Sequence, residues 1–350
     1  MSMARTMAKV SAGIVGLLVL VGGGGFLWAK SASAERLSRT YVTHRVDIPV
    51  PFPLSEEELA ALRAEKAAAA PADPAAPVDP AAPPADPLAG VDLDALARER
   101  AMERGKHLVQ ARYGCVECHG ADFGGGTMID APPIGKILGR NITMGKGSVV
   151  TGYSVADWDR IVRHGVKPDG KPAAMPSADF FGMSDRELSD VIVYISAQPP
   201  VDKDVPPPTL GPVGTFLVAT GEIRLSAEEL GDHQKAHVVE PPNPEPTAAF
   251  GKHLAQVCTG CHRPDYSGGP VPGGDPSWPP ARNLTPHAEG LPNYTFAEFE
   301  ALIREGKGRS GQPVRQPMLA IAAYGKNMTD VEVKALYEYL VTVPPKPTSK

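Results

Sequence analysis

Two short motifs contain all four cysteines of this 350-residue chain. One motif reads YGCVECHG and the other QVCTGCHR, and in each the two cysteines are separated by two residues and followed at once by a histidine. The residues are Cys115, Cys118 and His119 in the first motif and Cys258, Cys261 and His262 in the second. This pattern is typical of a c-type haem attachment site, where each thiol can add to a haem vinyl group and the imidazole binds the iron from the proximal side. We therefore expect two covalently attached haems.

Other chemistries use the same cysteine spacing. A zinc ribbon could take the four thiols, but it would leave His119 and His262 without a role and would have to close over far more residues than zinc sites usually do. A redox disulfide pair is a further alternative, and it too gives the adjoining histidine no function.

The second axial ligand of each iron decides between an electron carrier and a catalyst. Met175 lies 56 residues after His119, and Met318 lies 56 residues after His262, each in a loop that contains proline. A methionine opposite a histidine closes the iron and raises its reduction potential, as in cytochromes c that transfer electrons. We therefore predict Met175 and Met318 as distal ligands.

Rival ligands exist in both halves of the chain. Met183 and Met328 correspond to each other, but each precedes a predicted helix cap, where a packing residue is expected. His164 is replaced by a glutamate in the second half. His107 and His253 correspond within the sequence GKHL, and we expect a surface or hydrogen-bonding role for them.

Arginine and proline near each motif suggest further contacts to the haem group. Arg140 and Arg282 stand in the related sequences RNIT and RNLT, and a guanidinium suits a haem propionate because it can donate two parallel hydrogen bonds. A solvated loop arginine is the alternative. Pro133 and Pro280 are candidates for orienting the proximal imidazoles through their carbonyl groups.

The two motifs belong to an internal repeat. RGKHLVQARYGCVECHG is echoed by FGKHLAQVCTGCHR, YSVADWDRIVRHG by YTFAEFEALIREG, and MSDRELSDVIVYI by MTDVEVKALYEYL, always 141 to 146 residues apart. Correlated similarity of this kind indicates two copies of one domain. In each copy we expect a first helix before the haem motif (Leu93–Arg112 and Thr247–Val257), a second opened by Ser154 or Thr295, and a last opened by Ser184 or Thr329.

The N-terminal part differs in composition from the two copies. An uncharged stretch over residues 10–29 follows Arg5 and Lys9, is long enough to span a bilayer, and predicts a membrane anchor with its N-terminus inside. A signal peptide cleaved after Ala34 is the alternative. A helix from Ser55 and an Ala/Pro/Asp spacer follow, and a second Pro-rich connector separates the copies, with a helix or turn near Ser226.

These motifs together resemble class I cytochrome c domains, in particular those of the multihaem cytochrome subunits of bacterial membrane-bound alcohol and gluconate dehydrogenases. The resemblance implies a mainly α fold and the axial ligands named above. The chain differs from those subunits in two respects. They carry three such domains and this chain two, and the Ala/Pro tract is not part of their pattern. The segments we expect are an anchor (1–34), an extended segment and linker (35–97), cytochrome c domain 1 (98–200), a connector (201–244) and cytochrome c domain 2 (245–345).

The sequence thus predicts a dihaem cytochrome c on the periplasmic side of a bacterial inner membrane. It would pass single electrons from a dehydrogenase or quinol-oxidising complex to an acceptor such as a terminal oxidase or a soluble cytochrome. The net charge of −5 argues mildly against nucleic acid as a partner. The alternative is a dihaem enzyme, of the peroxidase or thiosulfate-oxidising type, in which one iron is open and catalytic.

Overall fold

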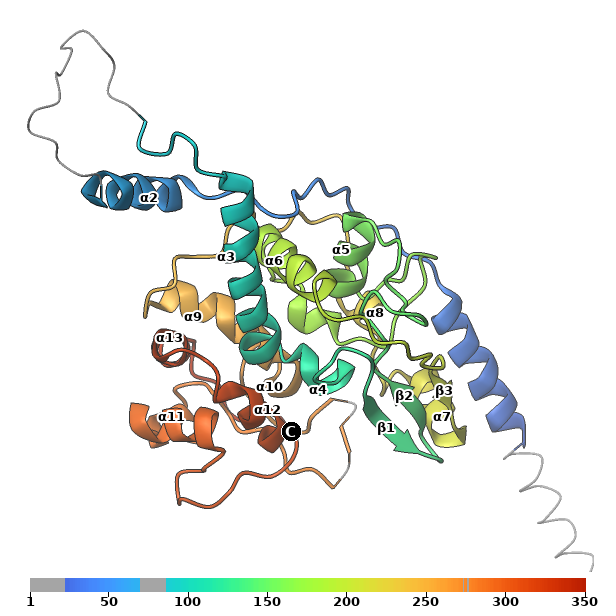
Figure 1. The fold of residues 1–350 in the computed structure, drawn as a ribbon. Coiled ribbons are helices and arrows are strands. Elements are labelled where there is room, and N and C mark those ends of the chain that lie inside the picture. The colour runs from blue at the N-terminus through green and yellow to red at the C-terminus, as the bar shows by residue number, and fades with distance from the viewer. Residues whose placement is uncertain (1–22, 70–85, 273, 276) are drawn as a thin grey trace, which may run out of the picture.

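The computed structural model of the chain describes residues 23–69 and 86–350, apart from residues 273 and 276. This part is mainly helical and contains two hydrophobic cores, one for each copy of the repeat (Figure 1). The predicted membrane helix and the Ala/Pro spacer lie largely outside the described residues. Within those residues, no helix is both long enough and apolar enough to cross a membrane.

The two domains have the same order of helices. The first domain contains α3 (Leu93–His107), the π-helical turn η1 (Leu108–Arg112), α4 (Cys115–His119), α5 (Val155–His164), the 3-10 helix η2 (Ser177–Phe180) and α6 (Asp185–Ser196). The second contains α9 (Ala248–Leu254), η3 (Ala255–Cys258), α10 (Thr259–His262), η4 (Leu291–Asn293), α11 (Phe296–Glu305), α12 (Met318–Gly325) and α13 (Asp330–Leu340).

Four of these helices begin at the predicted caps. In each case the serine or threonine side chain accepts a hydrogen bond from the third helical residue, whose carboxylate accepts one from the backbone of the cap. This reciprocal arrangement satisfies two backbone donors that a helix start would otherwise leave unpaired. The caps are Ser154 of α5, Ser184 of α6, Thr295 of α11 and Thr329 of α13.

In each domain the first and last helices cross at a glycine. A Cβ atom built on Gly105 would lie 2.2 Å from the carbonyl oxygen of Asp190, and one on Gly251 would lie 1.9 Å from that of Ala335. Any larger residue would force α3 away from α6, or α9 away from α13. These two glycines are the first residues of the repeated sequence GKHL, which accounts for glycine at that point of both copies.

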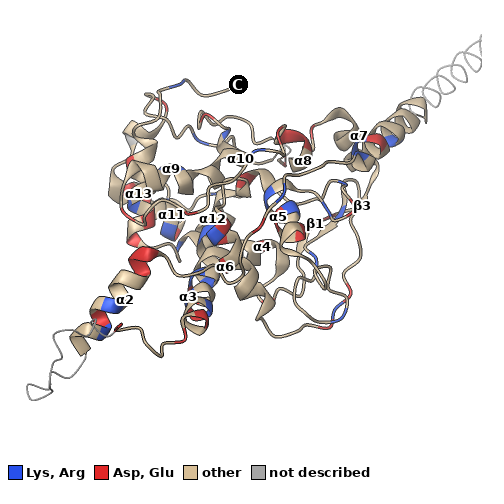
Figure 2. Cartoon of the chain, turned by 90° about the horizontal axis from the view of Figure 1, so that it is seen from above, with Lys and Arg blue, Asp and Glu red and all other residues tan. Residues whose placement is uncertain are grey.

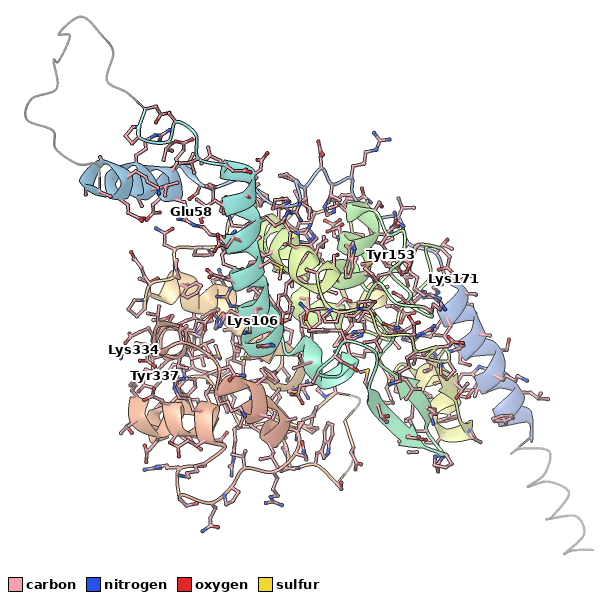
Figure 3. The ribbon with its side chains drawn as sticks, viewed as in Figure 1. Glu58, Lys106, Tyr153, Lys171, Lys334 and Tyr337 are labelled. Atoms are coloured by element: carbon pink, nitrogen blue, oxygen red, sulfur yellow. The ribbon has the colours of Figure 1, made fainter. Side chains whose placement is uncertain are left out.

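The segments that we expected to be linkers pack against the first domain. Ile48 and Phe52 belong to its core, and Glu58 of α2 (Glu56–Ala69) reaches Arg100 and Arg104 of α3 at 3.3 and 2.9 Å (Figure 3). The connector contains the two-residue strand β3 (Thr209–Leu210), α7 (Pro212–Thr220) and α8 (Ser226–Glu229). Only the last of these three elements was predicted.

Strand β3 completes a small sheet that the sequence did not suggest. It pairs antiparallel with β2 (Gly135–Leu138), with Gly135 opposite Leu210, and β2 pairs antiparallel with β1 (Thr127–Ala131). The N-terminal helix over residues 23–38 continues past the predicted boundary at residue 34 and lies beside α7 (Figure 1). The connector is therefore part of the first folded unit.

A buried network of charges joins the two domains. Arg112 lies between two glutamates, donating to Glu187 of α6 and, at 2.7 Å, to Glu332 of α13. His253 of the second domain contacts Glu187 at 2.9 Å, and His107 of the first domain contacts Glu332 at 2.8 Å. The two histidines of the GKHL sequences thus have the predicted hydrogen-bonding role, and each binds the capping glutamate of the other domain.

Acidic and basic side chains are otherwise interspersed over the helices, as Figure 2 shows for α2 and α3. Pairs whose two side chains are both exposed, such as Lys136 with Asp130, contribute little to stability. The network around Arg112 differs because its two glutamates are almost wholly buried. Burial alone would raise the pKa of Glu187, but the hydrogen bond from His253 and the charge of Arg112 lower it to about 2.

We predict that Arg112→Met lowers the free energy of unfolding by about 3–5 kcal/mol, because it leaves two buried carboxylates short of their shared cation. The matched control is Arg309→Ala, which removes an exposed ion pair with Glu298 and is expected to cost less than about 1 kcal/mol. Urea unfolding followed by circular dichroism measures both. Equal effects of the two substitutions would contradict a central role for Arg112.

The same network predicts a pH dependence. The pKa of both Glu187 and Glu332 is lowered to about 2 in the folded chain from an ordinary value of 4.5. A carboxylate whose folded pKa is lowered stabilises the fold fully above the unfolded pKa and loses this contribution as pH falls. Stability should therefore decline between about pH 4.5 and pH 2, and the decline should be smaller in Arg112→Met.

Candidate haem sites

The four cysteines lie in or beside two short helices, and each is partly buried. Cys115 and Cys118 belong to α4, Cys258 ends η3, and Cys261 lies in α10; all four are free thiols. Burial raises the pKa of Cys115 and Cys258 to about 12, so these thiols stay protonated, unlike the thiolate of a redox-active pair. Among the described residues, these cysteines do not form a convergent metal-binding group, which disfavours the zinc ribbon.

Both proximal histidines are oriented by a backbone carbonyl. The Nδ1 atom of His119 lies 2.8 Å from the carbonyl oxygen of Arg140, and that of His262 lies 2.6 Å from the carbonyl oxygen of Arg282. Because a carbonyl can only accept, Nδ1 carries the proton and Nε2 keeps its lone pair for a metal. Burial lowers the pKa of both imidazoles, which keeps them neutral.

The prediction that Pro133 and Pro280 orient these imidazoles is wrong. The carbonyl of Pro133 accepts hydrogen bonds from the backbone of Val213 and Gly214 at the start of α7. The arginine carbonyls take the role instead, because the loops that carry them run beside the two haem motifs.

An Asn-x-Thr turn holds each of those loops. Asn141 is fully buried; its side-chain oxygen accepts from the backbone and hydroxyl of Thr143, and its amide donates to the carbonyl of Val201 at 2.7 Å. Asn283 and Thr285 repeat the arrangement, with the carbonyl of Lys346 as acceptor. The loop is thereby tied to the segment after the last helix, and the arginine carbonyl is fixed where the histidine needs it.

A cavity of about 890 Å³ opens in the second domain beside its haem motif. Its wall is predominantly apolar and includes the residues that the sequence predicted for this site, namely Cys258, Cys261, His262, Arg282 and Met318. The size and the lining suit a large planar cofactor with a few polar groups. The donor set, two thiols, an imidazole and a thioether, fits a covalently attached haem.

The two predicted methionine ligands stand in different local structures. Met175 lies in a loop before η2, and its carbonyl accepts hydrogen bonds from Ser226 and the backbone of Ser177. Met318 is the first residue of α12, an eight-residue helix that the sequence did not suggest. The rivals Met183 and Met328 pack against the two cores as predicted.

The two arginines are placed near the sites. Arg282 lines the cavity of the second domain. The Nε atom of Arg140 is buried and has no hydrogen-bond partner in the described part of the chain. An unpaired buried donor of this kind is costly, and a propionate would satisfy it. Propionate binding by Arg140 and Arg282 stays a prediction.

The fold brings the two haem motifs to the domain interface. Tyr324 of α12 lies against Gly114, which precedes Cys115, since a Cβ atom on that glycine would be 2.9 Å from the tyrosine ring. Asp179 of η2 likewise lies against Gly260, between Cys258 and Cys261, with a corresponding distance of 2.6 Å. Each domain thus contacts the haem motif of the other through the segment that follows its own predicted methionine ligand.

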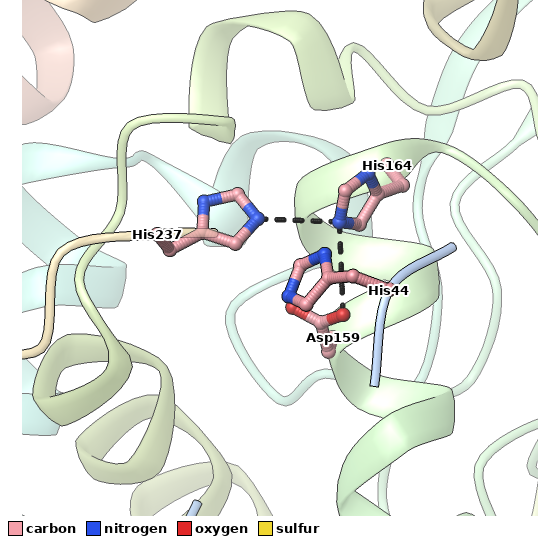
Figure 4. Close-up of side chains that lie close together, drawn as sticks. All are labelled: His44, Asp159, His164 and His237. Carbon is pink, nitrogen blue, oxygen red and sulfur yellow. Dashed lines mark hydrogen bonds and ion pairs between the residues drawn. The ribbon is translucent and has the colours of Figure 1, made fainter. Parts of the chain in front are cut away.

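Sequence reasoning missed a cluster of histidines outside the haem sites. His44, His164 and His237 converge beside Asp159, although they come from three separate stretches of the chain (Figure 4). His233 joins them through a hydrogen bond to His164. No regular spacing links them. The available signal was that three of the four lie in segments otherwise taken as linkers, where an isolated histidine has no packing role.

Comparison with known proteins supports the two-domain organisation. A family model described as cytochrome c matches residues 248–344, and one described as cytochrome C oxidase, cbb3-type, subunit III matches residues 100–195. The chain is 27% identical over 272 residues to the cytochrome c subunit of a quinone alcohol dehydrogenase from Gluconacetobacter polyoxogenes, covering 69% of this chain and 56% of that protein.

Two further relatives are similar at the same level. The gluconate 2-dehydrogenase cytochrome c subunit of Pantoea cypripedii is 25% identical, covering 73% of this chain and 63% of that protein. The fructose dehydrogenase cytochrome subunit of Gluconobacter japonicus is 24% identical, covering 73% of this chain and 55% of that protein. The chain spans little more than half the length of these relatives. It contains two cytochrome c domains and is homologous, at modest identity, to cytochrome c subunits of alcohol, gluconate and fructose dehydrogenases.

Proposed function

We propose that the chain is a dihaem cytochrome that passes single electrons between a dehydrogenase and a respiratory acceptor. One observation carries the proposal: in both domains an arginine carbonyl fixes Nδ1–H of the histidine next to the cysteines, leaving Nε2 free to bind iron. When bound, each haem supplies a one-electron couple. The chain's own residues would hold each haem through the thiols and bind it through the imidazole, and the apolar cavity of the second domain would surround one of the two haems.

The predicted methionines favour an electron carrier over a dihaem enzyme. A catalytic iron needs one open or replaceable position, whereas a thioether in each domain would close both. Met175 is held through its backbone by Ser226 and Ser177, and Met318 lines the cavity that we assign to a haem. The equal spacing from each proximal histidine supports the same role for both.

The reciprocal contacts at the interface support transfer between the two haems. Tyr324 and Asp179 each cross the interface to a haem motif, and Arg112 locks the domains together beside them. A rigid interface keeps the two redox centres at a fixed separation. The names of the relatives suggest a dehydrogenase as the electron donor, while a terminal oxidase or a soluble cytochrome is our proposed acceptor.

We further propose that the chain is anchored to the inner membrane with both domains in the periplasm. The apolar stretch over residues 10–29 and the positive charge before it support this location. The described end of that stretch exposes Phe26, Leu27 and Trp28, and Trp28 contacts the exposed Phe216 of α7 with ring centroids 6.2 Å apart. Exposed aromatic side chains of this kind suit the interface between a membrane and water.

The number of haems is tested by mass. The full chain, produced in a bacterium that matures c-type cytochromes, is expected to carry the mass of two haems under denaturing conditions. The double substitution Cys115→Ala with Cys118→Ala should leave one haem, and the equivalent substitution of Cys258 and Cys261 should also leave one. A chain that carries fewer than two haems before substitution would contradict the proposal.

Carbon monoxide tests the axial ligands. We expect the reduced dihaem protein not to bind the gas, whereas Met175→Ala and Met318→Ala each open one iron and give the optical change of one haem. Met183→Leu and Met328→Leu are matched controls, because they conserve volume in the core and leave the irons closed. If the unsubstituted protein binds the gas at one haem, the dihaem enzyme is the better assignment.

The membrane location is tested by fractionation. The full chain should sediment with membranes, resist high salt and dissolve in detergent. Leu18→Arg should shift it toward the soluble fraction, because a charge in the middle of a spanning helix costs about 2.5–3.5 kcal/mol. Leu319→Arg, at an exposed site of α12, is the control. The mass of the mature N-terminus distinguishes an anchor from cleavage after Ala34.

A further inference from the structure

Of the nine histidines in the chain, four gather in one place that has no part in either haem site. His44 comes from the N-terminal segment, His164 ends α5, and His237 follows α8 (Figure 4). His233 also follows α8. Asp159, one turn before His164, completes the group. One ligand atom from each of His44, Asp159, His164 and His237 lies within 4.8 Å of the others.

Hydrogen bonds fix the direction of the lone pairs. Nε2 of His233 lies 2.8 Å from the carbonyl oxygen of Ala227, so it must donate, and Nδ1 of the same ring is left as an acceptor. That Nδ1 lies 3.1 Å from Nδ1 of His164. His164 therefore donates from Nδ1, and its Nε2 carries a lone pair.

The lone pair of His164 points at further acceptors. Its Nε2 lies 3.2 Å from Nε2 of His237 and 3.7 Å from Oδ2 of Asp159. The ring of His237 also forms a hydrogen bond with the backbone of Phe181. His44 uses Nδ1 toward the carbonyl of His233 at 3.3 Å, which leaves its Nε2. Three imidazoles and a carboxylate thus converge, and within the described part of the chain none of their facing atoms is fixed as a hydrogen-bond donor.

The two carboxylate oxygens of Asp159 have different surroundings. Its Oδ1 binds Arg163 at 2.6 Å, and Arg163 is further neutralised by Asp185 at 2.8 Å. Its Oδ2, in contrast, is buried and has no hydrogen-bond partner among the residues that the structure describes. A buried carboxylate oxygen without a donor is costly, and a bound cation would compensate it.

Burial raises the pKa of the Asp159 carboxyl above its ordinary value, and a cation bound at Oδ2 would offset that cost. Burial and the positive charge that the neighbouring imidazoles and Arg163 would add lower the pKa of His164 to about 2. Burial and the charge of Arg163 likewise lower the pKa of His237 to about 3. His164 and His237 are therefore neutral at physiological pH, which is the form that binds a metal ion.

We propose that His44, Asp159, His164 and His237 bind a divalent first-row transition-metal ion, with Zn²⁺ the best match. Three imidazole nitrogens and one carboxylate oxygen suit such ions, and four protein ligands make a closed, structural site. The ligand atoms around a tetrahedral zinc stand roughly 3.3 Å apart for bonds of about 2.0 Å. The separations of 3.2 and 3.7 Å around His164 are close to that value.

The ion would join three segments that are distant in sequence. His44 precedes α2, His164 belongs to the first haem domain, and His237 belongs to the connector. The site is also linked to the loop that carries Met175. Ser226 of α8 donates to the carbonyl of Met175, and the neighbouring Ala227 accepts from His233. The metal would therefore stiffen the support of the loop that carries the predicted methionine ligand.

Zinc binding to the dihaem protein tests the proposal. The full chain, prepared without a histidine tag, is treated with EDTA, desalted and titrated with Zn²⁺ by calorimetry, with zinc content measured by elemental analysis. We expect one zinc per chain. His233→Ala, which leaves the four ligands in place but removes the hydrogen bond that orients His164, should weaken binding by about 10–100-fold. His237→Ala and His237→Asn remove a ligand and should weaken it further.

The matched control is His287→Ala, because His287 is a surface histidine outside this group. It should bind one zinc as tightly as the unsubstituted chain. Haem absorption and circular dichroism confirm that each variant is folded, and they are independent of zinc content. A stripped protein that takes up no zinc would overturn the proposal, and so would equal affinity of the His237 and His287 variants.

Discussion

The structure depends on keeping two buried glutamates ionised at the interface between its domains. Glu187 and Glu332 each cap a last helix, and a carboxylate at a helix start is held there by backbone donors and the helix dipole. Burying both without a counter-charge would be prohibitive. Arg112 between them supplies that charge, and a histidine from the opposite domain forms a hydrogen bond with each glutamate. The caps of two helices and the docking of two domains are therefore one electrostatic unit.

The docking has a direct consequence for the haem sites. Because each glutamate is bound by a residue of the opposite domain, the domains face each other with their haem motifs toward the interface. Tyr324 and Asp179 occupy the space beside Gly114 and Gly260, so a Cβ atom at either glycine would meet the side chain of the opposite domain at less than 3.0 Å. Burial, with the charge of Glu229, raises the pKa of Asp179 to about 7, so this side chain is only partly ionised at neutral pH beside the second haem motif.

Local features of the fold could be predicted from the sequence, and features that depend on distant contacts could not. The caps at Ser154, Ser184, Thr295 and Thr329 followed from residue type and spacing, because a cap is satisfied within three residues. The acceptor for the proximal histidine was assigned to Pro133, whereas the carbonyl of Arg140 has that role. Choosing between two backbone carbonyls requires the path of the loop, which a buried Asn141 sets through contacts sixty residues away.

The domain interface and the histidine cluster could not be predicted from the sequence for the same reason, because both depend on contacts between distant residues. Arg112 and Glu332 both lie in the repeated sequences, but they are far apart in the chain and nothing in those sequences indicates that the two residues form a pair. The comparison of the two copies still gave a usable signal. GKHL and the haem cysteines are three residues further apart in the first copy, and the structure has the π-helical turn η1 there, which contains Arg112. The residues by which the first copy exceeds the second thus include the cation of the interface.

The same comparison bears on the metal site. Arg304 of the second domain binds Glu300, Asp330 and the carbonyl of Met328, as Arg163 binds Asp159, Asp185 and the carbonyl of Met183 in the first. This ion-pair unit needs no histidine, since the second copy has the exposed Glu305 where the first has His164. Packing therefore does not explain His164. The first copy differs because the N-terminal segment and the connector fold against it. The N-terminal segment places His44 beside His164, and the connector places His233 and His237 there. His164 is thus the histidine that the shared fold does not require and that the added segments surround with further imidazoles.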